Sequence, residues 1–119
     1  MGARPKPELV ELGKTLLTHI LSAASAKPDM DVEKAAREIA DALVKYYGLE
    51  EFIKLVQNVD KNKTYISYVH ERLPHLWKYY VTMLYGDDII RFLITEERKD
   101  DEWVVTDVTV VSILTPIST

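Results

Sequence analysis

A chain of 119 residues with 47% hydrophobic and 29% charged side chains has the size and composition of one soluble globular domain, which excludes wholesale disorder. Its net charge of -4 is shared equally, since residues 1–60 hold 8 basic and 10 acidic groups and residues 61–119 hold 7 and 9. This balance lacks the basic excess that phosphate neutralisation needs, and it argues against a nucleic-acid partner. The absence of cysteine excludes disulfides, thiolate metal sites and cysteine nucleophiles.

No stretch of the sequence predicts a membrane span. A spanning helix needs about 20 apolar residues in succession, and the apolar runs here are only a few residues long. Residues 1–6 read as a flexible arm and lack the apolar core of a signal peptide. We therefore expect a cytoplasmic protein without membrane association, and the lack of cysteine agrees with a reducing compartment.

The composition changes near Asp60. All eight alanines precede Leu43, whereas seven of the nine threonines and five of the seven tyrosines follow Asp60. Alanine favours helix interiors, while β-branched and aromatic residues favour strands. The sequence therefore predicts N-terminal helices packed on a C-terminal antiparallel sheet. Because neither half has a complete core of its own, residues 1–119 are predicted to form a single α+β domain.

Leucine and isoleucine recur at three- and four-residue spacing between Leu9 and Leu21, which predicts an amphipathic helix over residues 7–25. A glycine in this helix, Gly13, costs about 1 kcal/mol relative to alanine. We attribute Gly13 to the close approach of another backbone.

A second helix is predicted over residues 31–47, with Asp31 as its N-cap and Gly48 as its C-terminal stop. Alanine occupies many of its apolar positions, so a neighbouring element can pack closely against it. A third, shorter helix is predicted over residues 49–58.

The second half of the chain predicts three to four antiparallel strands. Four runs rich in β-branched and aromatic residues are separated by turn-forming and charged residues. These runs cover residues 64–70, 76–85, 89–97 and 103–114. For residues 64–85 a helical period also fits, interrupted at Pro74, so a helical alternative stays open there.

Asp107 is the main candidate for a catalytic residue. In a regular strand over residues 103–114 it shares a face with Val105 and Val111. A carboxylate in such an apolar face loses hydration, its pKa rises, and it can act as a general base near neutral pH. The hydroxyl of Tyr80 would then stabilise an oxyanion. In the alternative interpretation, Asp107 lies on a solvated face or pairs with a basic neighbour.

Aromatic residues of the second half are candidates for a surface that binds a ligand or a partner. Tyrosine and tryptophan combine a large apolar area with a polar group, which suits pockets and interfaces. The candidates are Trp77, Tyr79, Phe92 and Trp103. The same side chains would also pack well between neighbouring strands.

No pattern predicts a metal site or a cofactor. His70 and His75 are separated by five positions across Pro74, which is not a ligand spacing. The acidic clusters at 87–88 and 100–102 lack the longer loop of oxygen ligands that calcium needs.

The strands over 89–97 and 103–114 are apolar on both faces for part of their length, which exceeds what one layer of helices can cover. We therefore expect a non-enzymatic binding or interaction protein that forms a homodimer through the sheet or binds an apolar small molecule. One alternative is an isomerase- or hydrolase-like enzyme with a cone-shaped cavity and Asp107 as the general base. A second alternative is a winged-helix-like DNA-binding protein, against which the acidic balance argues.

Overall fold

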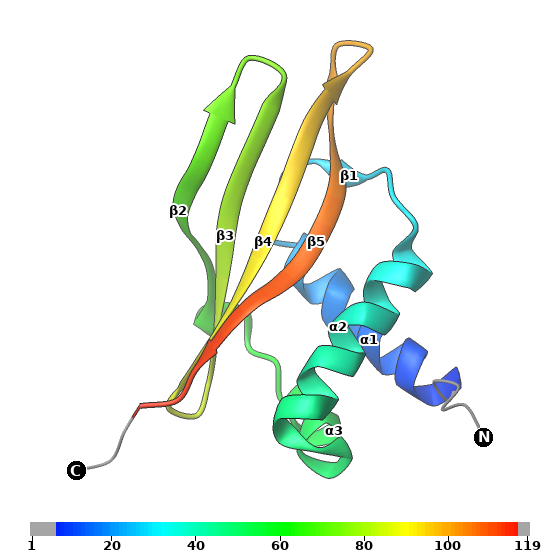
Figure 1. Cartoon of the computed structure of the whole chain (residues 1–119), viewed down its shortest axis with the longest axis vertical. Helices are drawn as coiled ribbons and strands as arrows, with labels where there is room; N and C mark the ends of the chain where they lie inside the picture. The colour runs from blue at the N-terminus through cyan, green and yellow to red at the C-terminus, as the bar shows by residue number, and fades with distance from the viewer. Residues whose placement is uncertain (1–6, 117–119) are drawn as a thin grey trace.

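The computed structural model describes residues 7–116, and the arm expected over residues 1–6 lies outside the described residues. Three helices lie on one side of the sheet, and the free ends of two hairpins extend past them (Figure 1). The predicted α+β class is confirmed. The elements are α1 (Pro7–Leu21), β1 (Lys27–Pro28), α2 (Val32–Tyr47), α3 (Leu49–Gln57), the 3-10 turn η1 (Lys61–Lys63), β2 (Thr64–Leu73), β3 (Leu76–Tyr85), β4 (Asp88–Lys99) and β5 (Glu102–Leu114).

Helix α1 ends at Leu21, four residues before its expected end, because the chain turns to form a strand that the sequence did not predict. Lys27 and Pro28 pair in parallel with Val104 and Val105 of β5. The pairing continues at Asp29, whose N–H donates to the carbonyl oxygen of Val105 at 2.8 Å. A strand of two residues has no periodicity to detect, so only the completed sheet defines it.

Helices α1 and α2 meet at Gly13, as the sequence analysis expected. A Cβ atom at Gly13 would lie 2.3 Å from the carbonyl oxygen of Ala36 in α2. Glycine is therefore required by the distance between the two backbones. The start of α2 is also confirmed, because the Asp31 side chain accepts from the N–H of Lys34 at 3.0 Å.

The sheet has the strand order β1-β5-β4-β3-β2, and β2 to β5 form an antiparallel meander. Residues 64–85 are strands, so the helical alternative for this stretch is wrong. Pro74 and His75 connect β2 to β3, where proline ends one strand and leaves the pairing of the hairpin intact.

Two bulges in β5 change which of its side chains share a face. Val105 pairs with Glu96 and Asp107 pairs with Thr95, so Thr106 is an extra residue between them. Because Glu96 and Thr95 point to opposite faces of β4, Val105 and Asp107 do as well. The prediction that Asp107 lies in the apolar face of Val105 is therefore wrong.

The core lies between the helices and the inner face of β3, β4 and β5. Tyr79, Phe92, Ile94 and Val105 have no exposed surface and contribute to it from the sheet. The helices contribute side chains with at most 1% of their surface exposed, among them Leu16, Ile39, Leu43 and Phe52. Both halves of the chain therefore share one core.

The helices leave strand β2 uncovered. Five of the nine exposed large hydrophobic side chains lie on this strand, with exposed fractions between 44% and 49%. They are Tyr65, Ile66, Tyr68, Val69 and Leu73. β2 is also an edge of the sheet, so one side of its backbone has no neighbouring strand among the described residues. No helix in the described part of the chain is long and apolar enough to cross a membrane.

Candidate functional site

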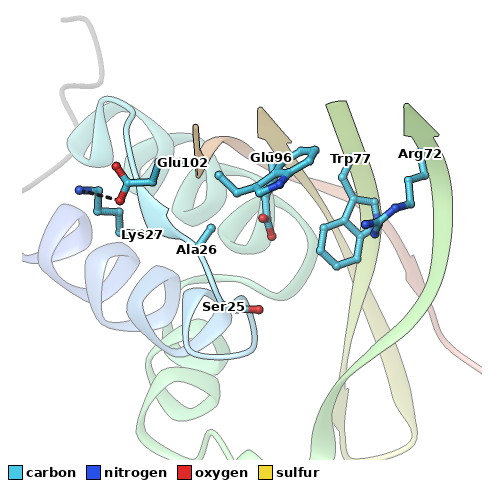
Figure 2. Close-up of a pocket in the computed structure, with 8 residues that line it drawn as sticks. Ser25, Ala26, Lys27, Arg72, Trp77, Glu96 and Glu102 are labelled. Carbon is cyan, nitrogen blue, oxygen red and sulfur yellow. Dashed lines mark ion pairs between the residues drawn. The ribbon is translucent and has the colours of Figure 1, made fainter. Parts of the chain in front are cut away.

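A pocket of about 460 Å³ opens where the segment after α1 approaches the turns that join β2 to β3 and β4 to β5. Figure 2 shows Ser25, Ala26 and Lys27 on one side of it and Trp77 and Arg72 on the other. We call it the tryptophan pocket. Its lining residues are Ser25, Ala26, Lys27, Arg72, Trp77, Glu96, Glu102 and Trp103.

Strand register brings these side chains together. Trp77 of β3 stands opposite both Arg72 of β2 and Glu96 of β4. Paired residues of antiparallel strands point to the same face, so all three project toward the helices. The helices end short of this part of the sheet (Figure 1), and the tryptophan pocket lies here.

Glu96 is the most buried polar group of the pocket, with only 2% of its surface exposed. Its carboxylate points into the space between Ala26 and Trp77 (Figure 2). The hydroxyl of Tyr79 donates a hydrogen bond to it. Burial and this carboxylate together raise the pKa of Tyr79, so the hydroxyl stays protonated and remains a donor.

Among the described residues, no lysine, arginine or histidine forms an ion pair with Glu96. The one close ion pair at the pocket joins Lys27 to Glu102 at 3.1 Å, and both of these side chains are more than half exposed. Glu96 is therefore a buried carboxylate whose hydrogen-bond partner is a neutral hydroxyl.

Trp77 presents its ring to two neighbours. The guanidinium carbon of Arg72 lies 4.7 Å from the ring centroid, which is a cation–π contact. The Tyr79 ring lies 4.4 Å away, centroid to centroid. The indole Nε1 of Trp77 is buried and has no hydrogen-bond partner in the described structure.

Two of the four aromatic candidates from the sequence, Trp77 and Trp103, line the tryptophan pocket. Tyr79 does not line it but holds Glu96 in place through its hydroxyl. Phe92 is fully buried in the core and is not brought to the pocket.

The two catalytic candidates are not brought together. Asp107 is exposed and borders a shallow groove of about 240 Å³ beside α2. Tyr80 lies in β3, which β4 separates from β5. The centroid of its ring lies 4.6 Å from that of Tyr68. Because Asp107 is exposed, it lacks the desolvation on which its proposed role as a general base depends.

Glu96 was not among the residues predicted from the sequence, although its position in β4 carries a signal. Ile90, Phe92 and Ile94 alternate along β4 and are all fully buried. Glu96 is the next position of the same period and continues the inward face. Arg72 could not be found in this way, because a bulge on each side of Val69 changes the alternation of β2.

Comparisons with protein-family models, with curated proteins and with solved structures find no match. Within the described residues, no group of three or more acidic or histidine side chains could hold a metal ion. The residues that line the tryptophan pocket are therefore the basis for what it could bind.

Proposed function

We propose that this protein binds a flat, largely apolar small molecule in the tryptophan pocket. One observation carries the proposal: the two tryptophans of the chain, 26 positions apart in the sequence, line the same pocket. The pocket volume of about 460 Å³ lies within the range of about 300–1,000 Å³ that is usual for small-molecule sites. The proposal keeps the cytoplasmic location expected from the cysteine-free sequence.

Binding of the uncharged aromatic dye Nile red tests this function, because its emission rises in an apolar site. We expect Trp103→Leu to weaken binding at least about fivefold, since an aromatic contact contributes about 1 kcal/mol. The matched control is Tyr80→Leu in β3, outside the pocket, which should change the affinity less than twofold. If Tyr80→Leu weakens binding and Trp103→Leu does not, the dye binds elsewhere and the proposal is wrong.

A second candidate function is self-association through strand β2, the form of homodimer that the structure favours most. The backbone of β2 has a free edge, and its apolar side chains are exposed on both faces. No charged residue occurs from Thr64 to Val69. An uncharged, apolar edge strand is a surface on which a second strand can pair.

Sedimentation tests the dimer. The wild-type protein should sediment at twice the 13.7 kDa of one chain. Val69→Lys should shift it to the monomer, because an edge lysine opposes strand pairing. Val111→Lys, at a similarly exposed valine of β5, should leave the dimer intact. A wild-type monomer at all concentrations would exclude this candidate.

A further inference from the structure

The tryptophan pocket combines a buried carboxylate with aromatic faces. Glu96 is 98% buried and lines the pocket, yet no positively charged side chain of the described chain pairs with it. A carboxylate taken out of water without a countercharge is unfavourable. A cation that enters the pocket would supply the missing charge.

The tryptophan faces favour the same kind of ligand. Indole is the best of the aromatic side chains at attracting a cation. The face of Trp77 already holds a cation, the guanidinium of Arg72, at 4.7 Å from its centroid. The geometry of this wall therefore suits a positive charge as well as an apolar ring.

Arg72 itself raises the opposite possibility, since its positive charge would attract an anion. Arg72, however, is an exposed side chain on the edge strand β2, so it can turn into water when a ligand enters. Glu96, in contrast, is only 2% exposed, and its carboxylate accepts a hydrogen bond from the Tyr79 hydroxyl inside the protein. A buried charge is screened less by water and salt than an exposed one, so Glu96 has the greater effect on the charge of the ligand that the pocket prefers.

We infer that the ligand is an organic cation, with an aromatic or apolar body against Trp77 and Trp103 and a positively charged nitrogen facing the carboxylate of Glu96. This inference rests on the proposed function and adds the charge of the ligand to it. The nitrogen donates a hydrogen bond to Glu96, which already accepts one from Tyr79.

The test compares three probes that share one body and differ in charge: 2-naphthylmethylammonium, neutral 2-naphthylmethanol and anionic 2-naphthoate. The chain has only two tryptophans, and both line the pocket. Their two indole N–H signals in a ¹H–¹⁵N correlation spectrum therefore report directly on this site. We expect the ammonium probe to shift both signals and to bind at least about tenfold more tightly than the alcohol. A charge-assisted hydrogen bond to Glu96 is stronger than one between neutral groups.

Glu96→Gln keeps the size of the side chain and its ability to accept from Tyr79 but removes the charge. It should lower the affinity for the ammonium probe to that for the alcohol, and leave the alcohol's affinity within twofold. The matched control is Glu97→Gln, the next residue of β4, whose side chain points to the opposite face. It changes the net charge equally and should leave both affinities unchanged.

Each outcome decides between the claims. If the alcohol binds as tightly as the ammonium probe, the inference is wrong and the proposed function stands. If the naphthoate binds most tightly, Arg72 sets the charge preference and the inference is wrong. If no probe shifts the indole signals, the proposed function fails as well. Should Glu96→Gln not fold, the comparison of the three probes on the wild-type protein still gives the answer.

Discussion

Gly13 lies inside helix α1, where it faces helix α2. A glycine inside a helix is unfavourable by itself, and in the sequence only the close approach of another backbone explains it. The structure supplies that neighbour, the backbone of Ala36. Backbone atoms cannot move aside in the way that the end of a long side chain can, so the constraint is strict.

Gly13→Ala is therefore expected to destabilise the protein, although alanine is the better helix former. The added Cβ would lie 2.3 Å from the carbonyl oxygen of Ala36, so α1 and α2 must separate. We expect the free energy of unfolding to fall by about 1–3 kcal/mol, as for other overpacked sites. Urea denaturation measures it. Thr18→Ala, an exposed site on the same helix, serves as the control and should change stability by less than about 0.5 kcal/mol. A stabilised Gly13→Ala protein would contradict the close approach.

Among the individual elements, strand β5 shows that a bulge changes which side chains face the core, so that the sequence pattern alone predicts the wrong face. Regular alternation places Val105 and Val111 on one face, but Val105 is fully buried and Val111 is 44% exposed. The extra residues in β5 are Thr106 and Val111, and each reverses the facing of the side chains that come after it in the strand. Nothing in the run of valines and threonines marks where such an extra residue falls.

The same substitution at these two positions tests the bulged register. Val105→Thr buries a hydroxyl in the core and should lower the free energy of unfolding by about 1–3 kcal/mol. Val111→Thr exposes its hydroxyl to water and should change it by less than about 0.5 kcal/mol. Thermal or urea denaturation distinguishes them. Equal effects at both sites would mean that the strand alternates regularly and that Asp107 shares the face of Val105.

At the scale of the whole molecule, helices and sheet are joined by one core. Buried side chains from α1, α2 and α3 contact those from β3, β4 and β5 in a single cluster. Neither half can keep its apolar surface covered without the other. Cooperative unfolding of the whole chain is the expected consequence.

Unfolding should therefore show one transition, whether it is observed by helical circular dichroism or by the fluorescence of the two tryptophans in the sheet. Ile39→Val removes one methylene from the core side of α2 and should lower both midpoints together, at a cost of about 0.5–1.5 kcal/mol. Two separate midpoints, or a shift in only one signal, would show that the helices and the sheet are independent units and that the single-domain prediction is wrong.

The sequence was sufficient to predict the α+β class, the three helices to within a few residues of their ends, the strands β4 and β5, and the cap at Asp31. These features depend on composition, periodicity and local hydrogen bonds, which a short window of sequence contains. For residues 64–85 the sequence left a helical alternative open, which the strands β2 and β3 exclude. It also identified Trp77 and Trp103 as candidates, because large aromatic side chains stand out wherever they lie.

Which of these residues come into contact depends on the tertiary structure. The pairing of β1 with β5, the bulges that expose Asp107, and the convergence of Arg72, Trp77, Glu96 and Trp103 on one pocket depend on the register of distant segments. Register is set by how the whole sheet packs against the helices, and no local pattern encodes it. The proposed binding site therefore depends on the fold, because residues far apart in the sequence line the same pocket.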